Sequence, residues 1–423
     1  MLDFNYIRLL FIVISTIVAY FIVAKGMRSK QKILLLFCII FLCLYSGIGG
    51  ALKDVNPDYT FFYIGFILIF AATVRFSSFS VNYSKDSATL GSFIDRHAGK
   101  LIILYFLIKL TLLIYPEFKL FNLISPPPPM LSGFDFESEG DNYSGGALAS
   151  IIYLVRGFVK PFFFLGLYKY RNKTSKILFF LFFDLYIGYC SSGYVGRGTI
   201  LQTAIIAFFT MYANMGKKER KILVISACSV MPLVIFGFYR YSLVRMGTDV
   251  SGESISQAVE IVFGQEITYP RHFNTYINFK GNHIVDYLLW FVLLPLPGFL
   301  KFGYGNYFLN REFSTEMLGL DAGNTSFFVL LPGVVGESIY VFGPYLYWIH
   351  AVILGIFVKF VVKTFTSNEV FTYLYFLYIV TFSFMLARAG TISVYPTTLK
   401  GCIILVIVFY FVNRSSKIKR RHG

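Results

Sequence analysis

The residues of this chain best suited to binding a phosphate-bearing ligand are certain arginines. They lie in segments between apolar runs, beside glycines or aromatic residues. Arg197 lies in segment 193–199, with the sequence GYVGRGT. Its glycines let the backbone come close to a ligand, and the N-terminus of a following helix favours an anion. A guanidinium group also binds phosphate oxygens through a bidentate fork. The alternative is a tight turn that carries an arginine at the membrane surface.

Further arginines with comparable settings come from separate segments, and they are Arg245, Arg271 and Arg388. Together with Arg197, we expect them to form an electropositive pocket on the outer face of a membrane, suited to a pyrophosphate group. Arg240 precedes Arg245 by five residues, near the mouth of the same helix, and joins the predicted ligand-binding set. Each arginine alone could instead extend to lipid headgroups.

We expect arginines, and no metal ion or other cofactor, to neutralise a leaving group in this pocket. The long segment 240–343 contains no DxD-type pair of carboxylates, and Asp54 and Asp58 are too loosely spaced to imitate one well. Five cysteines lie in or beside apolar runs without a CxxC or a metal-like spacing. Neither a zinc site nor a disulfide framework is therefore indicated.

Two residues are candidates for the general base of a transfer reaction. His272 follows Arg271 in the sequence YPRHF, and the pKa of a histidine lies near neutrality. Glu337 stands in the apolar run GVVGES, where burial would strengthen its carboxylate as a base. A lone exposed histidine is commonly inert, so the alternative for His272 is no chemical role.

Charges inside apolar runs form a second set, because a charge in hydrocarbon is costly. Arg156 and Lys160 lie one helical turn apart in one run, and Asp184 lies midway along the next. They predict either a buried structural ion pair or a pair of cations that helps to hold a lipid-linked phosphate. We interpret His350 and Lys400, also in apolar runs, as structural or lipid-facing.

The elements that must position these residues are membrane helices. The chain has 423 residues, of which 56% are hydrophobic and 14% charged. A soluble domain carries roughly a quarter charged residues, and about 20 apolar residues span a bilayer as a helix. The alternating polarity of an outer-membrane barrel is missing. The net charge of +16 gathers in short loops, which indicates cytoplasmic loops of a membrane protein and not a nucleic-acid partner.

We predict an all-α polytopic protein with about eleven transmembrane helices, or twelve as the alternative. The predicted spans lie at about 6–24, 33–50, 59–74, 101–115, 147–168, 177–191, 198–213, 222–239, 344–362, 370–387 and 396–412. Basic residues gather in 25–32, 75–100, 169–176, 216–221 and the C-terminal tail. The positive-inside rule then places the N-terminus outside and the C-terminus in the cytoplasm.

Two outer segments stand out by length within this single integral-membrane domain, 1–423. Segment 116–146 contains four consecutive prolines followed by alternating acids, which predicts a stiff solvated spacer or a loop that binds a cation or a basic sugar. Segment 240–343 is predicted as a large periplasmic loop, and long ordered loops are usually functional. Within it, residues 284–300 are apolar but contain two prolines, which favours an interfacial or re-entrant helix over a twelfth span.

The chain from about 145 to 412 resembles the Wzy family, the bacterial polymerases of lipid-linked oligosaccharide repeat units such as O-antigen. The segments that carry the resemblance are GYVGRGT at 193–199, VRMG at 244–247, YPR at 269–271, LLPLP at 293–297, GESIY at 336–340 with FG at 342–343, and LARAG at 386–390. Their order, sidedness and spacing make the match, since no one of them is diagnostic. At His272 the chain departs from the family, where a related polymerase can have an acid.

The resemblance implies a metal-independent, GT-C-like glycosyltransferase of the bacterial inner membrane, acting in lipopolysaccharide biosynthesis. The donor would be a glycan on undecaprenyl pyrophosphate, and the acceptor one new lipid-linked unit at the periplasmic face. A chain-length co-polymerase and membrane lipids would be partners. The outer-loop arginines named above would correspond to those thought essential in the family. The alternatives are a flippase or transporter of the lipid-linked unit, with charges along a path through the bilayer, and a periplasmic-face O-antigen ligase.

Overall fold

The computed structural model of the chain describes residues 3–78, 87–113, 119–127, 147–193, 195, 197–246, 270, 283–293, 296, 309–320, 329–366 and 370, with isolated positions between 382 and 410. Within these residues every extended regular element is a helix, and an isolated β-bridge joins Phe4 to Leu52. The predicted all-α class is therefore confirmed for the described part of the chain.

The chain divides into two compact units, each discontinuous in sequence and described here by itself. Unit 1 combines Met1–Ser87 with Phe263–Leu399, and unit 2 combines Ala88–Val262 with Lys400–Gly423. The apolar pattern suggests one integral-membrane domain and gives no signal for this division. Unit 1 contains Glu337 and Arg388, whereas unit 2 contains Arg156, Arg197 and Arg240.

Unit 1 is a helical bundle, and asparagine side chains cap the starts of two of its helices. The side-chain oxygens of Asn5 and Asn56 accept backbone N–H bonds at the starts of the first and third helices, as helix N-caps commonly do. The elements are α1 (Tyr6–Ala24), α2 (Ser29–Leu42), the π-helical turn η1 (Cys43–Gly47), η2 (Ile48–Ala51), α3 (Pro57–Phe76), α12 (Ile284–Leu293), α13 (Leu309–Leu318) and α14 (Gly333–Thr366).

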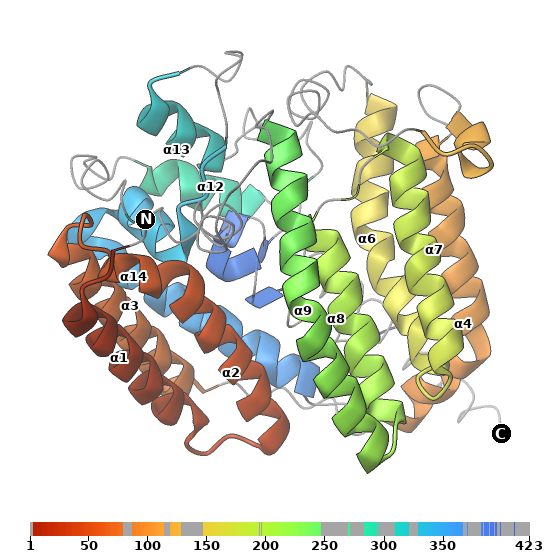
Figure 1. Cartoon of the computed structure of the whole chain (residues 1–423), viewed down its shortest axis with the longest axis horizontal. Coiled ribbons are helices and arrows are strands. Elements are labelled where there is room, and N and C mark those ends of the chain that lie inside the picture. The colour runs from red at the N-terminus through yellow and green to blue at the C-terminus, as the bar shows by residue number, and fades with distance from the viewer. Residues whose placement is uncertain are drawn as a thin grey trace. The chain divides into compact units, whose positions relative to one another are not determined.

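Helix α3 packs against both α1 and α14, so the N-terminal helices and α14 share one core (Figure 1). A Cβ atom at Gly355 would lie 2.7 Å from Cβ of Thr73, which shows how closely α14 approaches α3. Small residues commonly permit such contacts in membrane bundles. Polar side chains inside this core find partners as well: the hydroxyls of Thr16 and Tyr63 lie 2.9 Å apart, and Lys359 donates to the carbonyl of Val74 at 2.6 Å.

Helix α14 begins eleven residues before the predicted span at 344–362. Gly343 interrupts it with φ 75° and ψ 170°, and Pro344 follows without a backbone N–H. The Gly-Pro break divides α14 into two helical parts, and the second part starts at Pro344, where the predicted span begins. Segment 240–343 also contains the end of α9, α12 and α13, and α12 occupies the first ten residues of the apolar stretch 284–300.

Unit 2 contains α4 (Ser87–Leu110), η4 (Thr111–Leu113), η5 (Lys119–Leu123), α6 (Ala147–Lys169), α7 (Thr174–Ser192), α8 (Arg197–Asn214) and α9 (Lys217–Met246). Figure 1 shows α4, α6 and α7 running beside one another. A Cβ atom at Gly166 of α6 would lie 2.3 Å from a side-chain carbon of Ile102 of α4, so this glycine allows close packing. Residues 119–127 of segment 116–146 contact α7, because the hydroxyls of Tyr186 and Tyr189 donate to the carbonyls of Leu123 and Pro127 at 2.6 and 2.9 Å.

Four helices of the described residues are long and apolar enough to cross a membrane. They are Tyr6–Ala24, Gln31–Ala51, Pro57–Phe76 and Gly333–Thr364. Helices α4, α6, α7, α8 and α9 lie on five further predicted spans, and most of 370–387 and 396–412 lies outside the described residues. The chain thus has the character of a helical membrane protein. The total of about eleven spans and their sidedness stay predictions.

The surface of α1 supports this conclusion. It buries Ile12, Ala19 and Val23, yet leaves Ile7 and Phe21 about two-thirds exposed, at 68% and 67%. A run of large apolar side chains on an unpartnered helix face is costly in water and favourable in lipid.

We predict that Gly343→Ala destabilises the protein by about 1–3 kcal/mol, because the backbone at Gly343 lies in a region that residues with a Cβ atom rarely adopt. The measurement is the free energy of unfolding in detergent. Gly91→Ala is the matched control: Gly91 is helical, and an added Cβ atom meets nothing within 4 Å. Equal stability changes in both variants would contradict a requirement for glycine at the break.

Candidate functional site

The structure describes the side chains of two predicted site residues, Glu337 and Arg388, both of unit 1. For the other described arginines it gives positions along helices: Arg156 within α6, Arg197 at the first residue of α8, and Arg240 and Arg245 in the last two turns of α9. Arg271 and His272 lie outside the described residues. The expected arginine pocket therefore stays a prediction.

Glu337 lies near the start of α14 and is completely buried. Its Oε2 accepts the backbone N–H of Thr391 at 2.6 Å, and its Oε1 accepts the Thr391 hydroxyl. A carboxyl group can be buried only if its oxygens are hydrogen-bonded, and one residue here serves both of them. In this arrangement Glu337 exposes no surface to a substrate and fastens α14 to the segment around Thr391.

Arg388 lies in the helical residues 385–388, just before a turn at Gly390, whose N–H donates to the carbonyl of Leu386 at 3.1 Å. Gly390 has φ +74°, and a Cβ atom there would lie 1.7 Å from Oε2 of Glu337, so only glycine allows the carboxylate to come this close. On its other side, the Ser46 hydroxyl donates to the carbonyl of Ala387 at 3.2 Å. The backbone around Arg388, which is itself partly buried, is therefore held from α14 and from η1.

The hydrogen bonds continue from Thr391 into the core of unit 1. Its hydroxyl contacts that of Tyr287 in α12, which lies 3.1 Å from Nε2 of His350. Nδ1 of His350 lies 2.6 Å from the hydroxyl of Ser338. His350 is fully buried, so the lipid-facing interpretation is wrong and the structural one agrees with its contacts. Sequence analysis missed Tyr287, Ser338 and Thr391, because uncharged hydroxyls in apolar runs give no signal without their partners.

The predicted turn before Arg197 is confirmed in the backbone. Helix α7 ends at Ser192, and Gly193 adopts the left-handed conformation, with φ 68°, while its N–H donates to Tyr189 at 2.7 Å. This is a common glycine-terminated helix end. Helix α8 begins at Arg197. The first residues of GYVGRGT thus lie between the ends of two helices, and its last three residues, from Arg197, form the start of the second.

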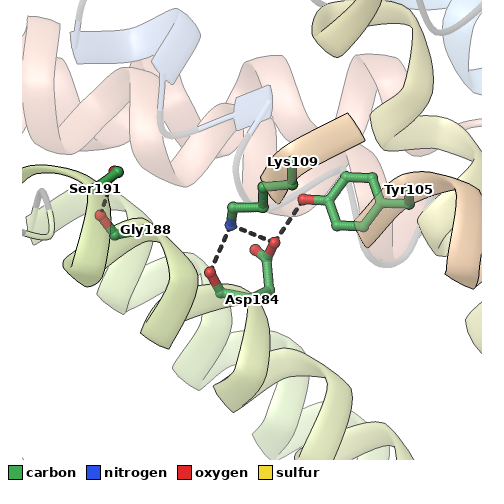
Figure 2. A network of polar contacts seen from close by, with 5 residues as sticks. All are labelled: Tyr105, Lys109, Asp184, Gly188 and Ser191. Atoms are coloured by element: carbon green, nitrogen blue, oxygen red, sulfur yellow. Dashed lines mark hydrogen bonds and ion pairs between the residues drawn. The ribbon is translucent and has the colours of Figure 1, made fainter. Parts of the chain in front are cut away.

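Asp184 of α7 forms a buried ion pair in unit 2, with Lys109 of α4 as its partner (Figure 2). The ammonium group of Lys109 donates to the carboxylate and to the backbone carbonyl of Asp184, and the hydroxyl of Tyr105 donates to the same carboxylate oxygen at 2.5 Å. The side chains of Lys109 and Asp184 are only 8% and 15% exposed. Asp184 therefore belongs to a structural pair, whose cation the sequence analysis did not identify.

Tyr105, which bonds to Asp184, also stacks on Phe163 with ring centroids 4.6 Å apart. Its neighbour Phe106 lies 4.9 Å from Phe183. The low exposure of Lys109 and Asp184 strengthens the attraction between the charges, but it also makes the loss of either partner costly.

A second group of titratable residues lies outside the spans, on α12 and α13. Glu312 is half-buried, and burial together with the neighbouring charges of Asp286 and Glu316 raises its pKa to about 7. Nε2 of His283 lies 3.5 Å from the carboxylate of Glu316, and its ring stacks on Tyr340 with centroids 4.4 Å apart. Glu312 thus changes charge near neutral pH. The spacing of Glu312 and Glu316 by one helical turn is the signal that could have found this group.

Comparison of this chain with protein-family models, curated proteins and solved structures found no match.

We predict that Asp184→Leu destabilises the protein by about 3–5 kcal/mol, because the variant leaves the Lys109 ammonium group buried without its carboxylate. The double variant Lys109→Met/Asp184→Leu should recover most of this loss, since it removes both charges. A double-mutant cycle of unfolding free energies measures the coupling. If the losses of Lys109→Met and Asp184→Leu simply add, the pair contributes nothing to stability.

The raised pKa of Glu312 predicts a pH-dependent stability. When the pKa of an acid is higher in the folded than in the unfolded protein, protonation of that acid favours the folded state. For Glu312 this contribution to the free energy of unfolding is fully present below the pKa of the unfolded protein, and it is lost as pH rises through about 7. Glu312→Gln should therefore raise the melting temperature by a few degrees or less at a pH of about 8, with no gain at a pH of about 4. Glu219→Gln is the control: its carboxylate accepts a helix-starting N–H from Gly216, so it should bring no gain at either pH. A pH-independent gain in Glu312→Gln would contradict the assignment.

Proposed function

We propose that this chain is a glycan polymerase of the bacterial inner membrane. It transfers a growing polysaccharide from undecaprenyl pyrophosphate to the non-reducing end of a lipid-linked repeat unit at the periplasmic face. The acceptor hydroxyl oxygen attacks the anomeric carbon of the donor, and the bond from that carbon to the pyrophosphate oxygen breaks. The pyrophosphate leaves with the electron pair, and arginine side chains stabilise its charge. The acceptor proton passes to a general base.

The observation that carries this proposal is the order of the glycine- and arginine-bearing segments from about 145 to 412, which resembles that of the Wzy polymerases. Two features of the fold support it. Arg197 begins a helix directly after a glycine turn, as a ligand-facing arginine would. Arg388 lies just before a turn, in backbone held from two sides by Glu337 and Ser46, and a fixed backbone favours a preorganised guanidinium group.

His272 is our first candidate for the general base, and Glu337 is the second. Glu337 is completely buried and both its oxygens accept hydrogen bonds from Thr391, so it would have to leave this arrangement to reach a sugar hydroxyl. Its contacts support a role in fixing the turn beside Arg388. We further propose a chain-length co-polymerase as a partner.

A transporter of the lipid-linked unit is the second candidate, and one observation favours it. Helix α14 is interrupted at Gly343, and buried ionisable groups stand on both sides of the break, at Glu337 and His350. Interrupted helices with such groups are common at the binding sites of transporters. The two candidates differ in the glycan that a cell lacking the protein would display.

Deletion of the gene distinguishes these functions. Loss of the polysaccharide ladder on a gel, with a core plus one repeat unit retained, is expected for a polymerase. Loss of every unit, including the first, would contradict it and favour the transporter or a ligase.

We predict that Arg197→Ala and Arg271→Ala each reduce polymer formation by at least about a hundredfold, because each removes a charge that stabilises the leaving group. The measurement is the ladder formed on complementation of the deletion strain, with membrane protein levels checked by immunoblot. Lys218→Ala is the matched control, since Lys218 is an exposed basic residue in the first turn of α9, on the predicted cytoplasmic side. Near-normal ladders in both arginine variants would overturn the proposed role of the arginines.

A further inference from the structure

A file of hydrogen-bonding groups runs through the core of unit 1, with a direct side bond between Tyr287 and Glu337 and a further side interaction between Tyr287 and Tyr395. In order, it joins the Glu337 carboxylate, the hydroxyls of Thr391 and Tyr287, the His350 imidazole and the Ser338 hydroxyl. None of these five residues is more than 1% exposed. Protons along the file therefore have to be exchanged between these groups, because bulk water does not reach them.

Proton counting restricts the file to two arrangements when the imidazole of His350 is neutral. Each hydroxyl has one proton to donate, and a neutral imidazole donates from one nitrogen and accepts at the other. If Glu337 is ionised, it accepts from Thr391, and Thr391 then accepts from Tyr287. Tyr287 in turn accepts from Nε2–H of His350, whose Nδ1 accepts from Ser338.

Protonation of Glu337 reverses every bond. Glu337 then donates to Thr391, Thr391 donates to Tyr287, and Tyr287 donates to Nε2 of His350. The imidazole proton must now be on Nδ1, from which it is donated to Ser338.

The Ser338 hydroxyl can end the file in either direction. Its oxygen lies 2.6 Å from Nδ1 of His350 and also 2.6 Å from the carbonyl oxygen of Val334, one turn earlier in α14. Its single proton is donated to the imidazole in the first arrangement and to the carbonyl in the second. In both arrangements every buried donor of the file thus has an acceptor, and each arrangement needs this to be stable.

We propose that Glu337 is a proton-binding site inside the core of unit 1, linked through this file to the tautomer of His350. The link crosses the break at Gly343, since Ser338 and His350 stand on opposite sides of it. This site does not depend on the proposed function, because it follows from the donors and acceptors alone.

The proton movement balances without any further reactant. A proton that reaches Nδ1 of His350 leaves the ring positively charged, and the ring passes the proton of Nε2 to Tyr287. Tyr287 passes its own proton to Thr391, and Thr391 passes its own to Oε1 of Glu337. Each relay group ends with one proton, the carboxylate becomes a carboxylic acid, and no electron is transferred.

Few other titratable groups face this site. Among the described residues, Tyr287 of α12 and Tyr395 interact electrostatically with Glu337, and Tyr287 also has a direct hydrogen bond to it. Neither tyrosine brings a permanent charge. Both routes from Glu337 to His350, through Thr391 and directly, pass through the Tyr287 hydroxyl.

The test is nitrogen NMR of the full chain, labelled with ¹⁵N-histidine and held in lipid nanodiscs, because the two nitrogens of a neutral imidazole have distinct signals with and without hydrogen. A His350→Asn variant identifies the His350 signals among those of five histidines. We expect His350 of the native chain to change from the Nε2–H to the Nδ1–H tautomer as pH falls, over the range in which the protein stays folded. The carboxylic acid band of Glu337 in the infrared spectrum should grow with the same midpoint.

Glu337→Gln is the decisive variant. A glutamine can accept the Thr391 N–H with its oxygen and donate to the Thr391 hydroxyl with its amide, which imitates the protonated acid. His350 should therefore hold the Nδ1–H tautomer at every pH. A native tautomer that never changes, or one that changes identically in Glu337→Gln, would overturn the proposal.

Tyr287→Phe tests the link itself, since both routes from Glu337 to His350 pass through the Tyr287 hydroxyl. The infrared band of Glu337 should still titrate, while His350 no longer follows it. Coupling that survives in folded Tyr287→Phe would show that the hydroxyl file does not carry it. If Tyr287→Phe does not fold, the His350 tautomer in Glu337→Gln remains the deciding measurement.

Discussion

The helices of unit 1 bring ionisable and hydroxyl-bearing side chains into an apolar core, and each of these groups has to find its partner inside the protein. Water is excluded from a completely buried position such as that of Glu337, so an unmet acceptor there would cost about 1–3 kcal/mol or more. Glu337 obtains its hydrogen bonds from Thr391, and the turn at Gly390 brings Thr391 close enough because glycine has no Cβ atom. Thr391 in turn contacts Tyr287 of α12. In unit 2 the same requirement joins Asp184 to Lys109.

The break in α14 is what allows the buried groups of unit 1 to meet. In an unbroken helix, residues twelve positions apart lie more than three turns from each other, at about 18 Å along the axis. Here Nδ1 of His350 lies 2.6 Å from the Ser338 hydroxyl. Gly343 redirects the chain so that the second half of α14 returns toward the first. Without the left-handed backbone at this glycine, the imidazole could not contact the first half of its own helix.

Sequence patterns predicted the helices of the fold better than the residues with which individual side chains pair. Hydropathy placed the first span at 6–24, where α1 runs from Tyr6 to Ala24, because an amphipathic or apolar run is a local property. Partners are set by tertiary packing. Asp184 stood out as a charge in an apolar run, yet its cation comes from a helix 75 residues earlier in the chain. Glu337 stood out for the same reason, but the residue that bonds both its oxygens lies 54 positions later and has no charge to reveal it.

The two oxygens of Glu337 have different roles. One holds the turn at Gly390 in place, and the other can gain or lose a proton. Oε2 accepts the backbone N–H of Thr391, a bond whose direction cannot reverse because a peptide nitrogen only donates. Oε1 meets the Thr391 hydroxyl, which can donate or accept. Protonation at Oε1 would therefore reverse the file toward His350 while the N–H bond continues to hold the turn beside Arg388. A polymerase would use the constant bond, which keeps an arginine in place, whereas a transporter would use the reversible one. Both uses are compatible with a single buried acid, because they depend on different atoms of it.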